Sequence, residues 1–179
     1  MNKFMVFAAV FYAAAGTATL AADDADTNLL DFEHTDFSDP RIYLGVGADN
    51  IRSRDDFDPS VYGMIELSTG VLHKGTGLRL RVSADASEVG YWVGVGFSME
   101  YHFETNPFYV EASLLGGWYT DDGDLDLDHD LEFRSQVMAG YIFDNGYDVA
   151  VGIAHKSNAG IGDDNPGSET VYIRLGYGI

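Results

Sequence analysis

The sequence contains no cysteine, and basic residues are scarce. Its 179 residues include 29 Asp and Glu against 10 Lys and Arg, which gives a formal net charge of −19 at pH 7. Without cysteine the chain can form neither a disulfide nor a reactive thiolate, so its stability must come from packing or from a membrane. Because no basic stripe offers an electrostatic footprint for phosphates, nucleic acid is not an expected partner.

Long apolar runs are absent after the N-terminus, so the sequence predicts no transmembrane helix. The opening segment, MNKFMVFAAVFYAAAGTATLA, predicts a secretory signal peptide with a positive start, an apolar centre and a small-x-small cleavage site that ends at Ala21. A membrane anchor is the alternative, but the run is short and no basic stop follows it. We expect a signal peptide at 1–21, an acidic N-terminal segment at 22–40 and a single folded domain at 41–179.

The acidic residues are concentrated in four runs. These runs are DDADTNLLDFEHTDFSD, DNIRSRDDFD, TDDGDLDLDHD and GDDN. Such runs are typical of solvated loops. None of them has the regular ligand spacing of an EF-hand, so we predict no bound metal.

Alternation of apolar with small or polar residues is the main repeating pattern. Its clearest example is 89–103, where one face carries Val89, Tyr91, Val93, Val95, Phe97, Met99, Tyr101 and Phe103. The period of two indicates a β-strand, and this one is too long for an ordinary soluble strand. Shorter segments repeat the pattern at 42–48, 61–68, 78–85, 108–119, 133–141, 148–156 and 171–177.

Eight such strands, several of them long enough to cross a bilayer at a tilt, predict an eight-stranded antiparallel transmembrane β-barrel of the outer-membrane type, spanning 41–179. Tight turns at 105–107 and 144–146 alternate with long polar connections near 49–59, 120–130 and 158–168. The inward face would carry paired charges, namely Arg79, Arg81, Arg134 and Arg174 with Glu66, Asp85, Glu100, Glu111 and Glu132. A soluble lipocalin-like barrel, the alternative, would place its apolar residues inside.

Three polar residues of the serine-hydrolase types interrupt the apolar face near the end of the chain. By the alternation, His155 and Ser157 lie on the same face as the apolar residues of 149–153. Glu169 lies on the same face as the apolar residues of 171–177. The two segments are joined directly, so they form a hairpin in which these side chains come within reach of one another. A serine needs a base, and the base needs an orienting acid. A polar rim, where strands leave the bilayer, is the alternative, and spacing alone does not decide between the two.

The same segment resembles a known family. The pattern H-x-S-N-A-G-I followed by N-P-G-x-E is similar to the active-site block of the PagL-type lipid A 3-O-deacylases. The resemblance implies a Ser-His-Glu triad made of Ser157, His155 and Glu169. It also implies an oxyanion hole formed by the Asn158 side chain and the backbone N–H of Gly160. The N-P-G stretch matches the loop that shapes the site.

The resemblance therefore implies an outer-membrane esterase that removes the acyl chain at the 3-position of lipid A without a cofactor. Its expected partners are lipid A or lipopolysaccharide as substrate and the lipids of the outer membrane. The sequence leaves open whether the chain forms a homodimer. Two rival hypotheses remain, a non-catalytic small barrel acting as an adhesin or structural protein and a soluble ligand-binding barrel.

Overall fold

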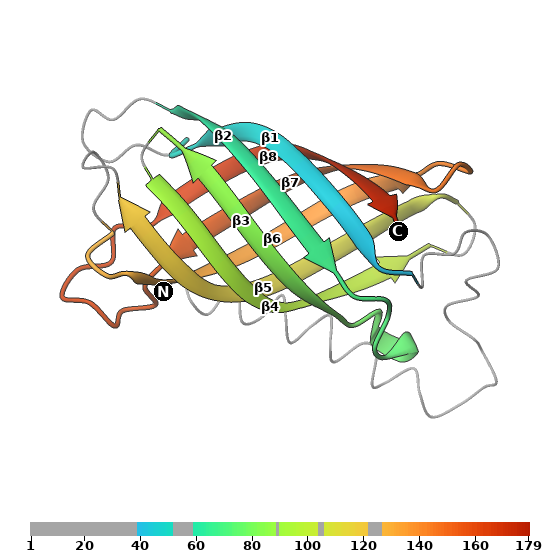
Figure 1. Cartoon of the computed structure of the whole chain (residues 1–179), viewed down its shortest axis with the longest axis horizontal. Coiled ribbons are helices and arrows are strands. Elements are labelled where there is room, and N and C mark those ends of the chain that lie inside the picture. Colours follow the sequence, from blue (N-terminus) through green and yellow to red (C-terminus); the bar gives the residue numbers. More distant parts are fainter. Residues whose placement is uncertain (1–38, 52–58, 89, 104–105, 122–126) are drawn as a thin grey trace.

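The computed structural model describes residues 39–51, 59–88, 90–103, 106–121 and 127–179. The predicted signal peptide and almost all of the acidic segment lie outside these residues. Within the described part, eight strands form a closed antiparallel barrel in which each strand pairs with the next and β1 pairs with β8 (Figure 1). The strands are β1 (Arg41–Asp49), β2 (Ser60–Ser68), β3 (Arg79–Ser87), β4 (Gly90–His102), β5 (Phe108–Asp121), β6 (Leu131–Ile142), β7 (Tyr147–Ser157) and β8 (Ser168–Gly178).

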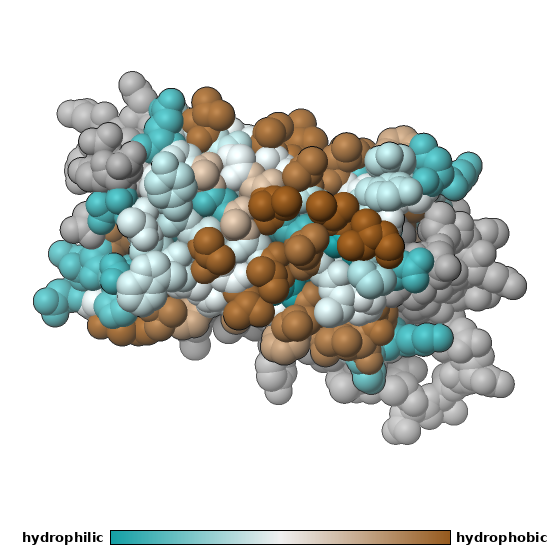
Figure 2. All heavy atoms as spheres, viewed as in Figure 1, coloured by the Kyte–Doolittle hydropathy of each residue, from teal (hydrophilic) through white to brown (hydrophobic). Residues whose placement is uncertain are grey.

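The predicted alternation places apolar side chains outside and charged ones inside. Along β4, Val93, Val95 and Phe97 are exposed, whereas Trp92 and Ser98 are buried. Figure 2 shows the apolar side chains across the middle of one side of the barrel, with hydrophilic residues towards both ends. Since a soluble barrel would bury its apolar face, this arrangement excludes the lipocalin alternative and fits a barrel surrounded by lipid. The described residues contain no helix long and apolar enough to span a membrane.

The two ends of the barrel differ in their connections. One end, here the loop end, carries the connections at 50–59, 88–89, 122–130 and 158–167. The other, here the turn end, carries those at 103–107 and 143–146, together with a ten-residue connection at 69–78 that contains a short 3₁₀ helix, η1 (Lys74–Thr76). The sequence pattern identified tight turns at this end and did not identify the longer one.

Aromatic residues mark the lipid face towards the turn end. Tyr147 and Tyr177 oppose each other on β7 and β8, with ring centroids 4.7 Å apart. Phe108 packs edge-on against Tyr141. Such rings sit at the bilayer–water interface of outer-membrane barrels, so they define one edge of the apolar band.

The interior is filled by an ion-pair network. Glu66 lies at its centre and accepts hydrogen bonds from three guanidinium groups at 2.6 to 3.4 Å. These groups belong to Arg81, Arg134 and Arg174. All nine inward charges predicted from the sequence are buried, and eight of them form ion pairs. The prediction of pairing is wrong for Glu132, whose carboxylate oxygens are buried without a hydrogen-bond partner among the described residues. Arg41, which pairs with Asp148 at 2.6 Å, and Lys156, which pairs with Asp85 at 2.8 Å, extend the network beyond that prediction.

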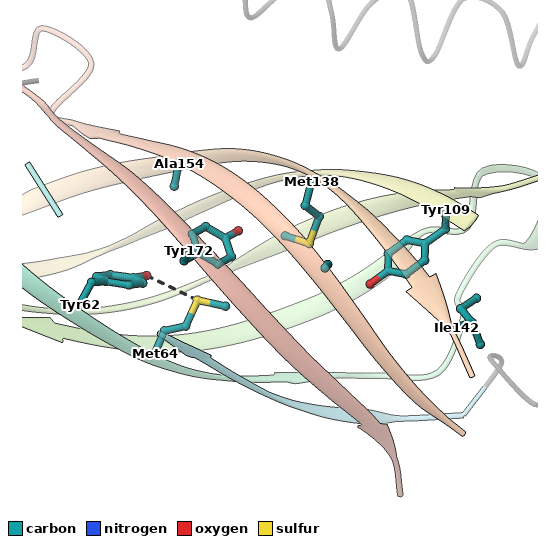
Figure 3. Packing of buried hydrophobic residues seen from close by; sticks show 8 residues of the cluster. Tyr62, Met64, Tyr109, Met138, Ile142, Ala154 and Tyr172 are labelled. Carbon is teal, nitrogen blue, oxygen red and sulfur yellow. Dashed lines mark hydrogen bonds between the residues drawn. The ribbon is translucent and has the colours of Figure 1, made fainter. Parts of the chain in front are cut away.

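Tyrosine and methionine side chains occupy much of the remaining interior volume. Figure 3 shows Tyr62, Tyr109 and Tyr172 lying inside the barrel, with the Tyr62 hydroxyl 3.5 Å from the sulfur of Met64. The Tyr172 hydroxyl reaches Gln136 at 2.9 Å, so its polar end is satisfied. The interior of an eight-stranded barrel is just wide enough for side chains to fill it, and here they form a rigid support for the strands.

We expect the network to carry a large share of the barrel's stability. Replacing Glu66 by glutamine keeps the shape but removes the negative charge shared by three arginines, and breaking a buried pair costs roughly 3–5 kcal/mol. The measurement is urea unfolding in detergent, followed by the mobility difference between heated and unheated protein on a gel. The same change at the exposed Glu88 is the matched control and should alter the free energy of unfolding by less than about 0.5 kcal/mol. Equal unfolding midpoints for E66Q and E88Q would contradict this account.

Candidate active site

The predicted catalytic residues lie at the loop end, where β7 ends and β8 begins. His155 and Glu169 are directly opposed in the β7–β8 pairing, and His155 Nδ1 lies 3.6 Å from Glu169 Oε1. Ser157 follows two residues later as the last residue of β7. The pleat therefore gives all three residues the outward parity of the neighbouring apolar residues.

The three side chains differ in exposure. Those of His155 and Glu169 are 33% and 31% exposed, whereas Ser157 is only 5% exposed. On one side Ser157 is paired with Phe133 of β6, and on the other it lies beyond Lys156 and Ser168, the last pair between β7 and β8. Ser157 is therefore sheltered at the strand end, whereas the imidazole of His155 and the carboxylate of Glu169 are partly exposed.

Lys156 separates His155 from Ser157 in the chain and points into the barrel. Its ammonium group pairs with Asp85 of β3 at 2.8 Å, where both side chains are almost fully buried. Lys156 therefore anchors the end of β7 inside the barrel, while its chain neighbours His155 and Ser157 have the outward parity.

The start of β8 is held in a similar way. Asp49, at the end of β1, accepts hydrogen bonds from the hydroxyl groups of Ser168 and Thr170, both at 2.7 Å. The backbone N–H of Ile51 donates to the carbonyl oxygen of Glu169 at 3.0 Å. Asp49 continues the inward parity of β1, but no sequence pattern distinguishes it as a residue that positions the site.

The glycine of the N-P-G stretch lies against the imidazole. Gly167 has a φ of +67°, and a β-carbon at this position would lie 2.8 Å from His155 Cε1. The left-handed conformation favours glycine, and the close contact requires the absence of a side chain. The sequence identified this loop but gave no physical reason for it.

The two predicted oxyanion-hole groups follow Ser157 directly but donate hydrogen bonds within the protein. The Asn158 side chain is fully buried, and its Nδ2 donates to the carbonyl oxygens of Leu127 and Asp164 at 3.0 and 2.7 Å. The backbone N–H of Gly160 donates to Asn158 Oδ1 at 2.8 Å. Within the described residues there is no group of three or more His, Asp or Glu residues that could hold a metal ion.

A family model described as "Lipid A 3-O-deacylase (PagL)" matches residues 42–178, which covers the eight strands apart from Arg41, the first residue of β1. The chain belongs to this family. It is therefore an outer-membrane hydrolase of the lipid A 3-O-deacylase type. In outer-membrane barrels the longer connections face the cell exterior, so we expect this orientation for the loop end.

Two solved structures are similar in fold. The crystal structure of the outer membrane enzyme PagL matches with a TM-score of 0.63 and 21% sequence identity, over 78% of this chain and 99% of that one. The crystal structure of Neisserial surface protein A matches with a TM-score of 0.52 and 12% identity, over 78% and 96% of the two chains. The comparison with curated proteins gives no match. Both structural matches describe a barrel of the same architecture.

Proposed function

We propose that this deacylase hydrolyses the ester at the 3-position of lipid A with Ser157 as nucleophile, His155 as base and Glu169 as the orienting acid. The observation that carries the proposal is the direct pairing of His155 with Glu169, at 3.6 Å, two residues from Ser157 on the lipid-facing side. Polar groups that face lipid are energetically costly, so polar residues retained on that side of a strand point to a function.

In this proposal each nitrogen of His155 has its own role. Nδ1 faces Glu169, which leaves Nε2 to take the proton of the Ser157 hydroxyl as its oxygen attacks the ester carbonyl. The bond to the sugar oxygen then breaks, and His155 returns the proton to that oxygen. Water, deprotonated by the same imidazole, attacks the acyl-serine; the bond to the Ser157 oxygen breaks, His155 returns the proton to that oxygen, and the fatty acid is released. The 3.6 Å contact exceeds hydrogen-bond length, and such contacts tighten when substrate binds.

Asn158 and Gly160 are the proposed donors to the developing oxyanion. Both currently donate within the protein, to Asp164 and Leu127 and to Asn158 Oδ1. To accept from both donors, the substrate oxygen must therefore replace two of these acceptors during the reaction, namely one carbonyl oxygen bound by Asn158 Nδ2 and the Asn158 Oδ1 bound by the Gly160 N–H. The site is built from one chain, so it does not require a homodimer.

Mass spectrometry of lipid A tests the proposal. Expression in a Gram-negative host whose lipid A keeps its 3-linked acyl chain should yield lipid A shortened by that single chain, with the amide-linked chains retained. The Ser157→Ala protein, expressed to the same level in the outer membrane, should leave lipid A unchanged. Intact lipid A in the wild-type strain would favour the non-catalytic adhesin or structural alternative.

A further inference from the structure

Two exterior loops meet beside Ser157. One is the β5–β6 connection, which is described from Leu127 onward, and the other is the β7–β8 connection at 158–167. Asn158 joins them, because its Nδ2 donates both to Leu127 O and to Asp164 O. The Asn158 amide is thus a bridge between the loops that immediately follows Ser157.

A third hydrogen bond closes this bridge into a ring. The Asp128 carboxylate accepts the backbone N–H of Asp164 at 2.7 Å. We call the four residues Leu127, Asp128, Asn158 and Asp164 the interloop clamp. The clamp has little free space, since a β-carbon at Gly162 would lie 2.5 Å from Asp128 Oδ2 and 2.9 Å from Asn158 Nδ2.

The clamp is anchored inside the barrel. The Leu127 side chain is 1% exposed and packs with Trp92, Leu115 and Tyr119 at the loop end of the interior. The rigid wall of the barrel is thereby connected, through Leu127 and Asp128, to the loop that carries the predicted oxyanion donors. This connection matters because pairing of β7 with β8 ends at Lys156 and Ser168, one residue before Ser157.

We propose that Asp128 is a positioning residue for the deacylase reaction. Its carboxylate accepts the Asp164 N–H and so holds the loop after Ser157 in place, even when the Asn158 amide exchanges one of its clamp acceptors for the substrate oxygen. The proposal rests on the catalytic function proposed above for Ser157. Asp128 contacts no reacting atom, so its loss should lower kcat far more than it changes KM. A displacement of about 1 Å in such a site costs on the order of 10²-fold in rate.

Three variants separate the hydrogen bond from charge and backbone strain. Asp128 has a φ of +66°, a region that asparagine and glycine both tolerate. Asp128→Asn removes the charge but keeps an acceptor oxygen, whereas Asp128→Gly removes both. Asp163→Ala removes a charge from an exposed neighbour in the same loop and is the matched control.

The experiment measures kcat and KM on purified lipid A in detergent micelles, together with amide hydrogen exchange of residues 158–167. We expect D128G to lower kcat by about 10- to 100-fold and to speed exchange of the Asp164 amide. D128N and D163A should stay within about threefold of wild type in both measurements. Equal kcat for D128G and D128N, or faster exchange in D128G without loss of kcat, would overturn the proposal. An inactive wild type with the same exchange differences would instead refute the proposed function and leave the clamp itself in place.

Discussion

Replacing Ser157 by alanine should lower the rate of lipid A deacylation by about 10⁴-fold or more, because no other group supplies the nucleophile. His155→Ala should cost a similar factor, since an unactivated hydroxyl is a poor nucleophile at neutral pH. The double variant should lose little beyond either single change, because members of a triad act as a unit. Rates are measured on purified lipid A in micelles by following release of the fatty acid.

Ser135 provides a matched control for this experiment. It faces outward on β6 directly opposite His155, and its hydroxyl donates to the His155 carbonyl oxygen at 3.4 Å. Ser135→Ala therefore removes a hydroxyl from the same surface, one strand away, without removing the proposed nucleophile. Folding of each variant is checked by its heat-dependent gel mobility. Full activity of Ser157→Ala would eliminate the proposed mechanism.

Glu169→Ala is expected to lower the rate by on the order of 10²- to 10³-fold, less than the loss of Ser157. The carboxylate only orients the imidazole and stabilises its charged form, so the nucleophile and base remain present without it. Since the Glu169 side chain is 31% exposed and pairs only with His155 in the ion pairs of the described residues, the barrel should unfold at the same urea concentration. Measuring both the deacylation rate and the unfolding midpoint of Glu169→Ala distinguishes a loss of catalysis from a loss of stability.

Glu169→Asp is the control that keeps the negative charge but shortens the side chain. It keeps the carboxylate but shortens the side chain by one methylene, which lengthens the 3.6 Å contact to His155. Its rate should therefore lie between those of wild type and Glu169→Ala. A wild-type rate for Glu169→Ala would mean that the imidazole is oriented by another group, and the acid would have to be reassigned.

The sequence was sufficient to predict the barrel because one physical rule operates on every strand. Lipid lies outside and charges lie inside, so a one-residue shift in strand register would expose Arg81 or Arg134 to hydrocarbon. The alternation therefore determines which side chains face lipid and which face the interior. The same parity placed His155, Ser157 and Glu169 together. The register, however, depends on the turn and the loop between β7 and β8, and the direct opposition of His155 to Glu169 became visible only in three dimensions.

Contacts between strands distant in the chain could not be predicted in this way. Asp49 meets Ser168 and Thr170 across more than one hundred residues, and parity says which face it occupies but not which partner it finds. Asp128 sits in a loop without periodicity, so no pattern distinguishes it from the other acids around it. The prediction for that loop was a solvated acidic run, and the interloop clamp was missed for this reason.

The outward position of the three polar residues has a consequence for how the enzyme meets its substrate. Side chains occupy the interior, so with Ser157 as the proposed nucleophile the reaction would take place on the outer wall of the barrel rather than at the bottom of a tunnel. Lipid A would then arrive by lateral diffusion within the outer leaflet, and the released fatty acid would depart into the same leaflet. The quantity that sets the rate is then the number of lipid A molecules per unit area of membrane. Diluting the lipid within the surface should slow the enzyme, whereas adding more surface of unchanged composition should not.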